Sequence, residues 1–349
     1  MKVRIVCYED VDTWILSKFA KKLNEELTKL GVDSDIAKVP NANADINHHI
    51  IYFSYDGHKN SIDTLMITHI DSPFKLKILK NQLESAKLGV CMSLDTMQKL
   101  INSGIPKEKL YYINPAHDDV IKPRKIVIGI LSKVHADGRK QENMLVRLCK
   151  KISSDDYCFK IMGSGWNEIV NKMKGMGFKV DYFEDFNYDR YVELVPTLDY
   201  FFYFSFDEGS MAFMDALTAG VPTIVTPQGY HLDAFGGISY PVKTFNDIVK
   251  TFGDISKKRK ILVDSVSKWT WKNYAKEHII LWDQLISNKN VDILLKNKQL
   301  KRLSNSPKTE KLYSSLNIFN NMFTIKTTIL YLTPKFIKNI CKKIISKIS

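Results

Sequence analysis

Residues 205–229 read SFDEGSMAFMDALTAGVPTIVTPQG, and this stretch decides the fold. It follows an apolar, aromatic run over 198–204 that indicates a buried strand. Residues 211–219 then carry a helical pattern with Ser210 at the N-cap position, and 223–225 begin another strand. Strand, turn, helix and strand in this order form the repeating unit of a parallel α/β sheet.

The turn between the strand and the helix holds the residues best suited to a ligand. Ligands of parallel α/β sheets bind outside the carboxyl ends of the strands. Asp207 in the turn and Asp215 on the helix are eight positions apart. That spacing can hold two carboxylates along one cleft wall, where they accept hydrogen bonds from a polyol. Gly209 lets a ligand approach the backbone, and the start of the helix favours an anionic group.

The same stretch resembles the E-x7-E element of retaining GT-B glycosyltransferases, especially glycosyltransferase family 4. Residues 207–225, DEGSMAFMDALTAGVPTIV, are similar to the family's EGGPMxLLEAMAxGxPVI run, with Asp207 at the first Glu and Asp215 at the second. Both positions hold the shorter Asp. The resemblance implies that the first carboxylate contacts the donor sugar and the second the ribose of the nucleotide. It also implies a donor-binding role for the residues between them: Glu208, Gly209, Ser210 and Met211. The plainer interpretation is an acidic turn and a helix-surface Asp in an ordinary α/β domain.

Composition fits a two-domain protein with an anionic partner. The chain has 349 residues, 44% of them hydrophobic, which is enough for two cores of ordinary size. Its formal charge of +13 indicates a nucleotide, nucleic-acid or membrane partner. No helix-turn-helix, RNP or zinc pattern accompanies the charge, so nucleic acid is not expected. The five cysteines show neither paired nor metal-ligand spacing, and we recognise no signal peptide or transmembrane run. We therefore expect a cytoplasmic protein with reduced thiols and no metal site.

Residues 1–119 are predicted to form a Rossmann-like domain on the acceptor side. A strand over 64–69 ends at His69, in a turn that also contains Asp71. At the carboxyl end of a strand, His69 is a candidate to position an acceptor hydroxyl or to contact the donor phosphate. The alternative is a turn stabilised by the Asp71 side chain.

The adjacent His48 and His49 of this domain precede the apolar run 50–53. If they lie on a strand, their side chains point to opposite faces of the sheet. They therefore do not make a convincing metal pair.

Residues 120–285 are predicted to form a second Rossmann-like domain that binds the nucleotide sugar. A buried strand over 126–130 leads into a cationic loop in which Arg139 and Lys140 stand in a GRK-x-E run. This loop resembles the family's phosphate loop: Lys supplies a point charge, Arg a bidentate fork and the next helix start amide donors. Lys133 is a further candidate, and the alternative is a solvated basic loop.

Two further segments complete the predicted donor site. The strand over 157–162 ends in a turn containing Gly163 and Gly165, which fits a family position where backbone lines the nucleotide pocket. Phe186 and Tyr188 lie in a loop that resembles the family's nucleobase-contacting segment. Residues 269–282 resemble its terminal TW-x-x-Y helix, which packs back across the first domain.

Residues 286–349 are predicted to be a basic linker and an amphipathic helical tail. After Glu310 no acidic residue occurs, while apolar residues recur at helical spacing over 336–348 among several lysines. This composition is typical of a helix that lies on an anionic membrane surface. We therefore expect 318–349 to hold the protein peripherally at the inner face of the cytoplasmic membrane. The alternative is a helix that packs on the protein itself or on another subunit.

The resemblance implies an α/β protein of GT-B fold, with two Rossmann-like domains facing each other across a cleft. It implies transfer of a sugar, expected to be a hexose, from a nucleotide-sugar donor to a hydroxyl of a glycan or glycolipid acceptor. We expect a lipid-linked polysaccharide or lipopolysaccharide, retention at the anomeric carbon, and neither cofactor nor metal. Arg139 and Lys140 would stabilise the leaving diphosphate. The alternative is a non-catalytic nucleotide-sugar-binding or scaffold protein that kept the fold.

Overall fold

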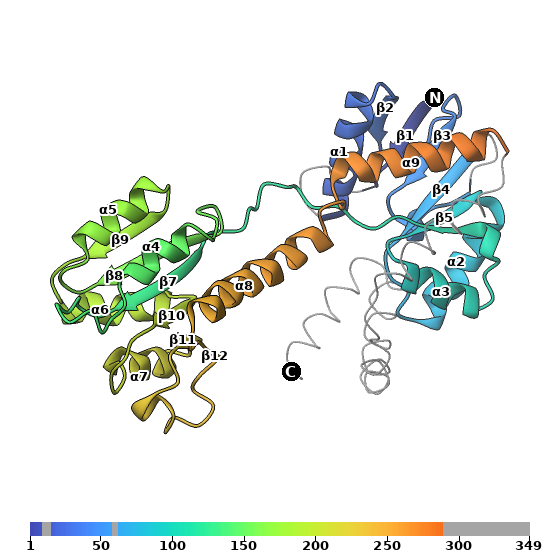
Figure 1. Ribbon diagram of the computed structural model, residues 1–349. Helices are drawn as coiled ribbons and strands as arrows, with labels where there is room; N and C mark the ends of the chain where they lie inside the picture. The colour runs from blue at the N-terminus through green and yellow to red at the C-terminus, as the bar shows by residue number, and fades with distance from the viewer. Residues whose placement is uncertain (9–14, 58–61, 289–349) are drawn as a thin grey trace. The chain divides into compact units, whose positions relative to one another are not determined.

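The computed structural model describes residues 1–8, 15–57 and 62–288. The chain folds into two compact units, one comprising Met1–Asp119 with Lys268–Ser349 as far as it is described, the other Val120–Ser267. Figure 1 labels most of the helices and strands of both. None of the described helices is long and apolar enough to cross a membrane. The predicted membrane-binding segment 318–349 lies outside the described residues.

The first unit is built on a parallel six-stranded sheet in the order β2-β1-β3-β4-β5-β6. The strands are β1 (Lys2–Val6), β2 (Asp33–Ala37), β3 (Ile46–His49), β4 (Ile62–Ile67), β5 (Leu88–Cys91) and β6 (Leu110–Tyr112). Because β2 lies on one side of β1 and β3 on the other, the winding direction reverses between β1 and β3. Such a reversal is where parallel sheets open a crevice for ligands.

Four α-helices accompany this sheet in the described residues: α1 (Ile15–Lys29), α2 (Pro73–Ser85), α3 (Leu94–Asn102) and α9 (Trp271–Ile286). Short 3-10 turns lie at η1 (Tyr52–Ser54) and η2 (Lys107–Lys109). Helix α9 belongs to this unit because its aromatic side chains enter the same core. The Phe19 ring of α1 lies 5.1 Å from the ring of Trp271 and 5.8 Å from that of Tyr274. Thr270 caps the start of α9 by accepting from the Asn273 amide.

The second unit repeats the plan with the strand order β12-β11-β10-β7-β8-β9, and every pair is parallel. Its strands are β7 (Ile126–Leu131), β8 (Tyr157–Met162), β9 (Lys179–Phe183), β10 (Tyr200–Tyr203), β11 (Thr223–Val225) and β12 (Tyr240–Pro241). Its helices are α4 (Asn143–Cys149), α5 (Asn167–Gly175), α6 (Tyr188–Leu194), α7 (Met211–Thr218) and α8 (Phe245–Ser265), with short 3-10 turns η3 (Val195–Thr197) and η4 (Gly229–His231). The prediction of an α/β protein with two parallel-sheet units is confirmed.

Both faces of the second sheet are buried, as is usual for parallel strands. The aromatic run before the motif divides between these faces because side chains alternate along a strand. Phe202 and Phe204 enter one core cluster, while Phe201 and Tyr203 enter the other. Tyr203 is the last residue of β10, so its side chain lies beside the turn that begins the motif.

Candidate functional site

A cavity of about 540 Å³ lies at the carboxyl ends of β7 and β8, between the β9–α6 loop and helix α7. The winding of the second sheet reverses between β7 and β10, so this is also the switch point of the unit. Six residues predicted to bind the donor line the cavity: Lys133, Gly163, Phe186, Tyr188, Met211 and Asp215. Its size falls in the range of small-molecule sites.

Gly163 is required where β7 and β8 meet the cavity. Its φ of +133° is one that side chains rarely adopt, and a Cβ atom there would lie 2.3 Å from the Ser132 carbonyl oxygen. The glycine thus lets the two strand-end loops approach each other. Gly165 packs instead beside Val134 and does not line the cavity.

Asp215 presents its carboxylate to the cavity from α7. The Tyr191 hydroxyl donates to Asp215 Oδ2 at 2.5 Å. Burial and this carboxylate raise the pKa of Tyr191 well above its usual value, so the phenol keeps its proton and remains a donor. Tyr191 therefore fixes one carboxylate oxygen, and Asp215 Oδ1 is the oxygen left to face a ligand. The sequence predicted Asp215 but not Tyr191.

Asp207 lies in the turn after β10, and the lining residues of the cavity do not include it. Protein donors surround its carboxylate: Lys140 Nζ at 2.6 Å, the Tyr203 hydroxyl at 2.7 and 2.8 Å, the Gly209 amide at 3.2 Å and Gln228 Nε2 at 3.2 Å. The two carboxylates of the motif thus belong to different hydrogen-bond networks. Tyr203 and Gln228 were not among the predicted site residues, although the strand alternation points Tyr203 toward this turn.

The electrostatics of the Asp207 network favour the ionised carboxylate. Burial alone raises the pKa of Asp207, but the hydrogen bonds from Lys140 and Tyr203 outweigh it and hold the pKa below the usual value. Burial also raises the pKa of Tyr203 well above its usual value, which keeps that phenol a donor. Lys140 Nζ also lies 4.6 Å from the centre of the Tyr203 ring, within cation–π range.

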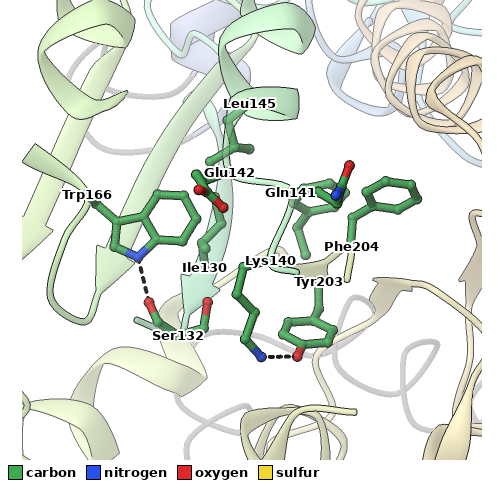
Figure 2. Close-up of a pocket in the computed structure, with 10 residues that line it drawn as sticks. Ile130, Ser132, Lys140, Gln141, Glu142, Leu145, Trp166, Tyr203 and Phe204 are labelled. Atoms are coloured by element: carbon green, nitrogen blue, oxygen red, sulfur yellow. Dashed lines mark hydrogen bonds between the residues drawn. The ribbon is translucent and has the colours of Figure 1, made fainter. Parts of the chain in front are cut away.

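Lys140 leads from the loop after β7 toward the end of β10, as Figure 2 shows. The side chain borders a small cavity of about 20 Å³ whose wall includes Trp166 and Tyr203. The Trp166 indole N–H donates to the Ser132 carbonyl at 2.5 Å, and its side chain is buried, so this tryptophan packs and braces the β7 loop. The ammonium contacts the Tyr203 hydroxyl in addition to Asp207.

Arg139 takes a different direction from its neighbour. Its guanidinium bonds His135 Nδ1 at 3.1 Å and lies 3.4 Å from an Asp137 carboxylate oxygen, all within its own loop. Its side chain is 42% exposed. Glu142 occupies the N-cap position of the short helix α4 that follows, and its side chain makes no capping bond. Both cations of this loop thus have an acidic neighbour, Arg139 at the surface and Lys140 in a largely buried pair, and neither lines the cavity of about 540 Å³.

The turn of residues 208–210 is held by a buried histidine. The Ser210 amide donates to His231 Nε2 at 2.9 Å, and His231 Nδ1 lies 3.1 Å from the Thr226 carbonyl, so the ring proton belongs on Nδ1. Burial lowers the pKa of His231. Ser210 occupies the N-cap position of α7 as predicted, but its side chain makes no capping bond. Glu208 and Gly209 lie in this turn and do not line the cavity.

His69 follows β4 in the first unit and is 68% exposed. Lys75 Nζ lies 3.3 Å from His69 Nε2 and 2.8 Å from Asp71 Oδ2. Ser72 caps α2 by accepting from the Lys75 amide. These contacts account for the turn, and a catalytic role for His69 stays a prediction. Within residues 1–8, 15–57 and 62–288, no group of three or more His, Cys, Asp or Glu side chains is arranged to hold a metal ion.

No family model and no curated protein matches this chain. Among solved structures it is similar to the lipopolysaccharide outer core galactosyltransferase WaaB, with 11% identity over 79% of this chain and 97% of that one (TM-score 0.33). It is similar to WaaG, a glycosyltransferase involved in lipopolysaccharide biosynthesis, at 11% identity over 79% and 94% (TM-score 0.33). HepE of Anabaena, in complex with UDP and glucose, matches at 12% identity over 87% and 99% (TM-score 0.31). WaaB and WaaG are named as glycosyltransferases, but TM-scores below 0.5 assign no role to this chain.

Proposed function

We propose that this chain is a glycosyltransferase of the GT-B type that binds its nucleotide-sugar donor in the second unit. One observation carries the proposal. Residues that the sequence singled out in four separate segments line a single cavity of about 540 Å³ at a sheet switch point. The parallel sheet gathers the loops after its strands at one edge, and the residues that the sequence singled out in those loops meet there in one cavity. The resemblance of residues 207–225 to the family motif supports the same conclusion.

The lining chemistry suits a nucleotide. Asp215, with one oxygen fixed by Tyr191, accepts hydrogen bonds from ribose hydroxyls. Phe186 and Tyr188 are exposed aromatic side chains at the mouth, suited to contact a flat base. Lys133 brings a positive charge to the β7 end, where the diphosphate is expected.

The transfer step is assigned to the Asp207 network and its neighbours. The Asp207 carboxylate accepts from a donor-sugar hydroxyl, while Lys140 and Arg139 stabilise the negative charge that grows on the leaving diphosphate. Retention at the anomeric carbon, a hexosyl donor and independence of metal are the family's pattern and part of this proposal. So are a lipid-linked surface glycan as acceptor and a membrane contact through residues 318–349.

A non-catalytic nucleotide-sugar-binding protein is the second candidate, and one observation favours it. Both oxygens of Asp207 accept from protein groups, and Lys140 is paired with that carboxylate. In this arrangement the two predicted catalytic charges neutralise each other. A catalytic cycle requires the donor to displace at least one of these contacts.

The deciding experiment combines binding and turnover. The full chain is screened against UDP-, GDP-, ADP- and dTDP-sugars by thermal shift, since a ligand of the native state raises Tm. Release of nucleoside diphosphate is then measured for every donor that binds. Binding with release supports the transferase, and binding without release supports the second candidate. If no nucleotide or nucleotide sugar raises Tm, both are wrong.

A further inference from the structure

The first unit contains a buried chain of hydrogen bonds that the proposed donor site does not use. His49 Nε2 lies 3.1 Å from Asp63 Oδ1, and His49 Nδ1 lies 3.0 Å from the Tyr8 hydroxyl. The Tyr55 hydroxyl donates to the other carboxylate oxygen, Asp63 Oδ2, at 3.0 Å. His49 and Asp63 are 0% and 1% exposed. A polar group that deep in an apolar core is costly unless it is hydrogen-bonded, and these contacts satisfy it.

This chain of bonds ends at the switch point of the first sheet. Val6, the last residue of β1, is in register with His49, the last residue of β3, and the winding reverses between these two strands. Tyr8 follows β1 by two residues. Of the residues in the chain of bonds, His49, Asp63 and Tyr55 are buried, whereas Tyr8 is only half-buried. Tyr8 is therefore the end at which a ligand can join.

An ionised Asp63 and a neutral His49 together give every bond in this chain one direction. An ionised carboxylate only accepts, so Asp63 accepts a hydrogen bond from the Tyr55 hydroxyl on one oxygen and from His49 Nε2–H on the other. A neutral imidazole with its proton on Nε2 has an accepting Nδ1, so the Tyr8 hydroxyl donates to His49. Burial, together with the negative charges of Asp56 and Asp63, raises the pKa of Tyr8 to about 12, so the phenol keeps the proton that it donates.

We propose that the Tyr8 oxygen is a subsite for a hydroxyl group of a neutral polyol, bound at the β1–β3 switch point of the first unit. Its one hydroxyl hydrogen points inward to His49, which leaves the oxygen lone pairs to accept a hydrogen bond from a ligand hydroxyl. The subsite selects donors of hydrogen bonds. A fully deprotonated anion such as sulfate or chloride cannot donate a hydrogen bond, and it meets the negative charge of Asp63 behind the phenol. Identifying the polyol as the sugar acceptor rests on the proposed function, but the subsite itself does not.

The test uses the full chain and methyl glycosides of glucose, galactose and mannose as probes, with saturation transfer from protein to sugar measured by NMR. Tyr8→Phe keeps the ring and removes the accepting oxygen. We expect it to weaken glycoside binding about tenfold, the loss of one well-formed hydrogen bond. Tyr55→Phe is the matched control, because it removes a buried donor from the same Asp63 and leaves the Tyr8 oxygen in place. We expect it to lower Tm but to retain the glycoside signal.

Two outcomes overturn the proposal: no saturation transfer from the wild-type chain to any of these glycosides, or equal binding by wild type and Tyr8→Phe. A third measurement uses only the wild-type protein, so it does not depend on whether the variants fold. The ¹⁵N resonances of His49 should show a protonated Nε2 and a bare Nδ1, and the reverse tautomer would refute the assigned direction. Nucleotide titration of the same samples keeps the proposed function separate. If no sample binds nucleotide, the wild type included, the donor site is wrong. The difference in glycoside binding between wild type and Tyr8→Phe tests the Tyr8 subsite separately.

Discussion

Lys140 Nζ lies 2.6 Å from Asp207 Oδ2, although the two residues are 67 positions apart in the chain. The side chains are 11% and 19% exposed, so this is a largely buried ion pair. It joins the loop after β7 to the turn after β10, the two strands that flank the switch point of the second unit. The pair thus fixes the geometry of the loop predicted to hold the phosphate and of the turn predicted to hold the sugar.

Replacing Lys140 with Ala should destabilise the second unit and abolish transfer. The substitution leaves a partly buried carboxylate without its cation, which we expect to cost about 2–3 kcal/mol of unfolding free energy. Nucleoside diphosphate release should fall at least about 100-fold, the scale of losing one preorganised charge contact. Urea unfolding and donor turnover measure both effects. Lys179→Ala, at the exposed start of β9, is the control and should change neither. Unchanged turnover in Lys140→Ala would remove Lys140 from the mechanism.

Substitutions of the two motif carboxylates should affect different quantities: nucleotide affinity for Asp215 and turnover for Asp207. Asp215→Asn alters the oxygen that faces the cavity, so we expect nucleotide affinity to fall about tenfold by calorimetry. Asp207→Asn lies outside the cavity lining, so it should keep most of the nucleotide affinity and lose turnover. Asp189→Asn, an exposed residue of α6 that does not line the cavity, is the matched control. Full activity in both motif variants with an intact melting curve would contradict the donor-site assignment.

Gly163→Ala should close the donor cavity from the backbone side. The new methyl group would lie 2.3 Å from the Ser132 carbonyl at a φ that alanine rarely adopts. We expect about 2–3 kcal/mol of destabilisation, measured by urea unfolding, together with weakened nucleotide binding. Gly175→Ala is the control, since nothing lies within 4 Å of its added methyl and it ends helix α5. That variant should be as stable as wild type or slightly more so. Equal stability of both variants would show that the β7 and β8 loops adjust.

Acidification should destabilise the second unit before Asp207 is protonated. Burial lowers the pKa of His231 in the folded state, so the unfolded chain takes up a proton at higher pH than the folded chain. The stability that neutral His231 contributes to the folded state is fully present above about pH 6.5. It is lost as the pH falls from there through the lowered folded pKa, at up to about 1.4 kcal/mol per pH unit. The pKa of Asp207 is lowered too, so its own contribution is lost only below about pH 4.

Urea unfolding of the wild-type chain and of His231→Gln between pH 7 and pH 5 measures this effect. Gln keeps a group that can accept from the Ser210 amide but does not titrate. The variant should be less stable at pH 7 and show a shallower loss toward pH 5. The same slope in both proteins would mean that other histidines cause the loss. His48 is one such group, because burial and the neighbouring His278 and His49 hold its pKa well below the usual value.

The predicted tail has its own test. The full chain should co-sediment with vesicles that contain anionic lipid, and the bound fraction should fall as salt rises, because screening weakens the attraction of lysines to the surface. A chain that ends at Ser304 should stay in the supernatant and still bind nucleotide. If the full chain does not co-sediment with anionic vesicles at low salt, residues 318–349 do not bind membrane. They would then pack against the protein itself or against a second subunit.

The sequence alone determined the class of fold and six of the fourteen residues that line the cavity. Strands and helices alternate along the chain, and their apolar periodicity and glycine punctuation are local signals that act within a few residues. The strands are parallel, so the loops after them gather at one edge of the sheet. The family resemblance assigned Phe186, Gly163 and Asp215 to one site, and their places after or beside strands agree with that assignment.

Only the tertiary structure decided which side chains meet. Lys140 with Asp207, Tyr191 with Asp215 and the Ser210 amide with His231 are pairs whose members are 67, 24 and 21 positions apart. Each depends on strand order and on the direction that each loop takes, and no local pattern encodes these. The sequence could propose Ser210 as a helix cap because caps are local, but a histidine 21 residues later satisfies a backbone group of that turn. In the same way, the sequence predicted opposite directions for His48 and His49 only if they lie on a strand, and the pairing of β1, β3 and β4 joined His49 to Asp63 and Tyr8. Long-range register sets these contacts, because burial of both sheet faces permits one alignment of the strands.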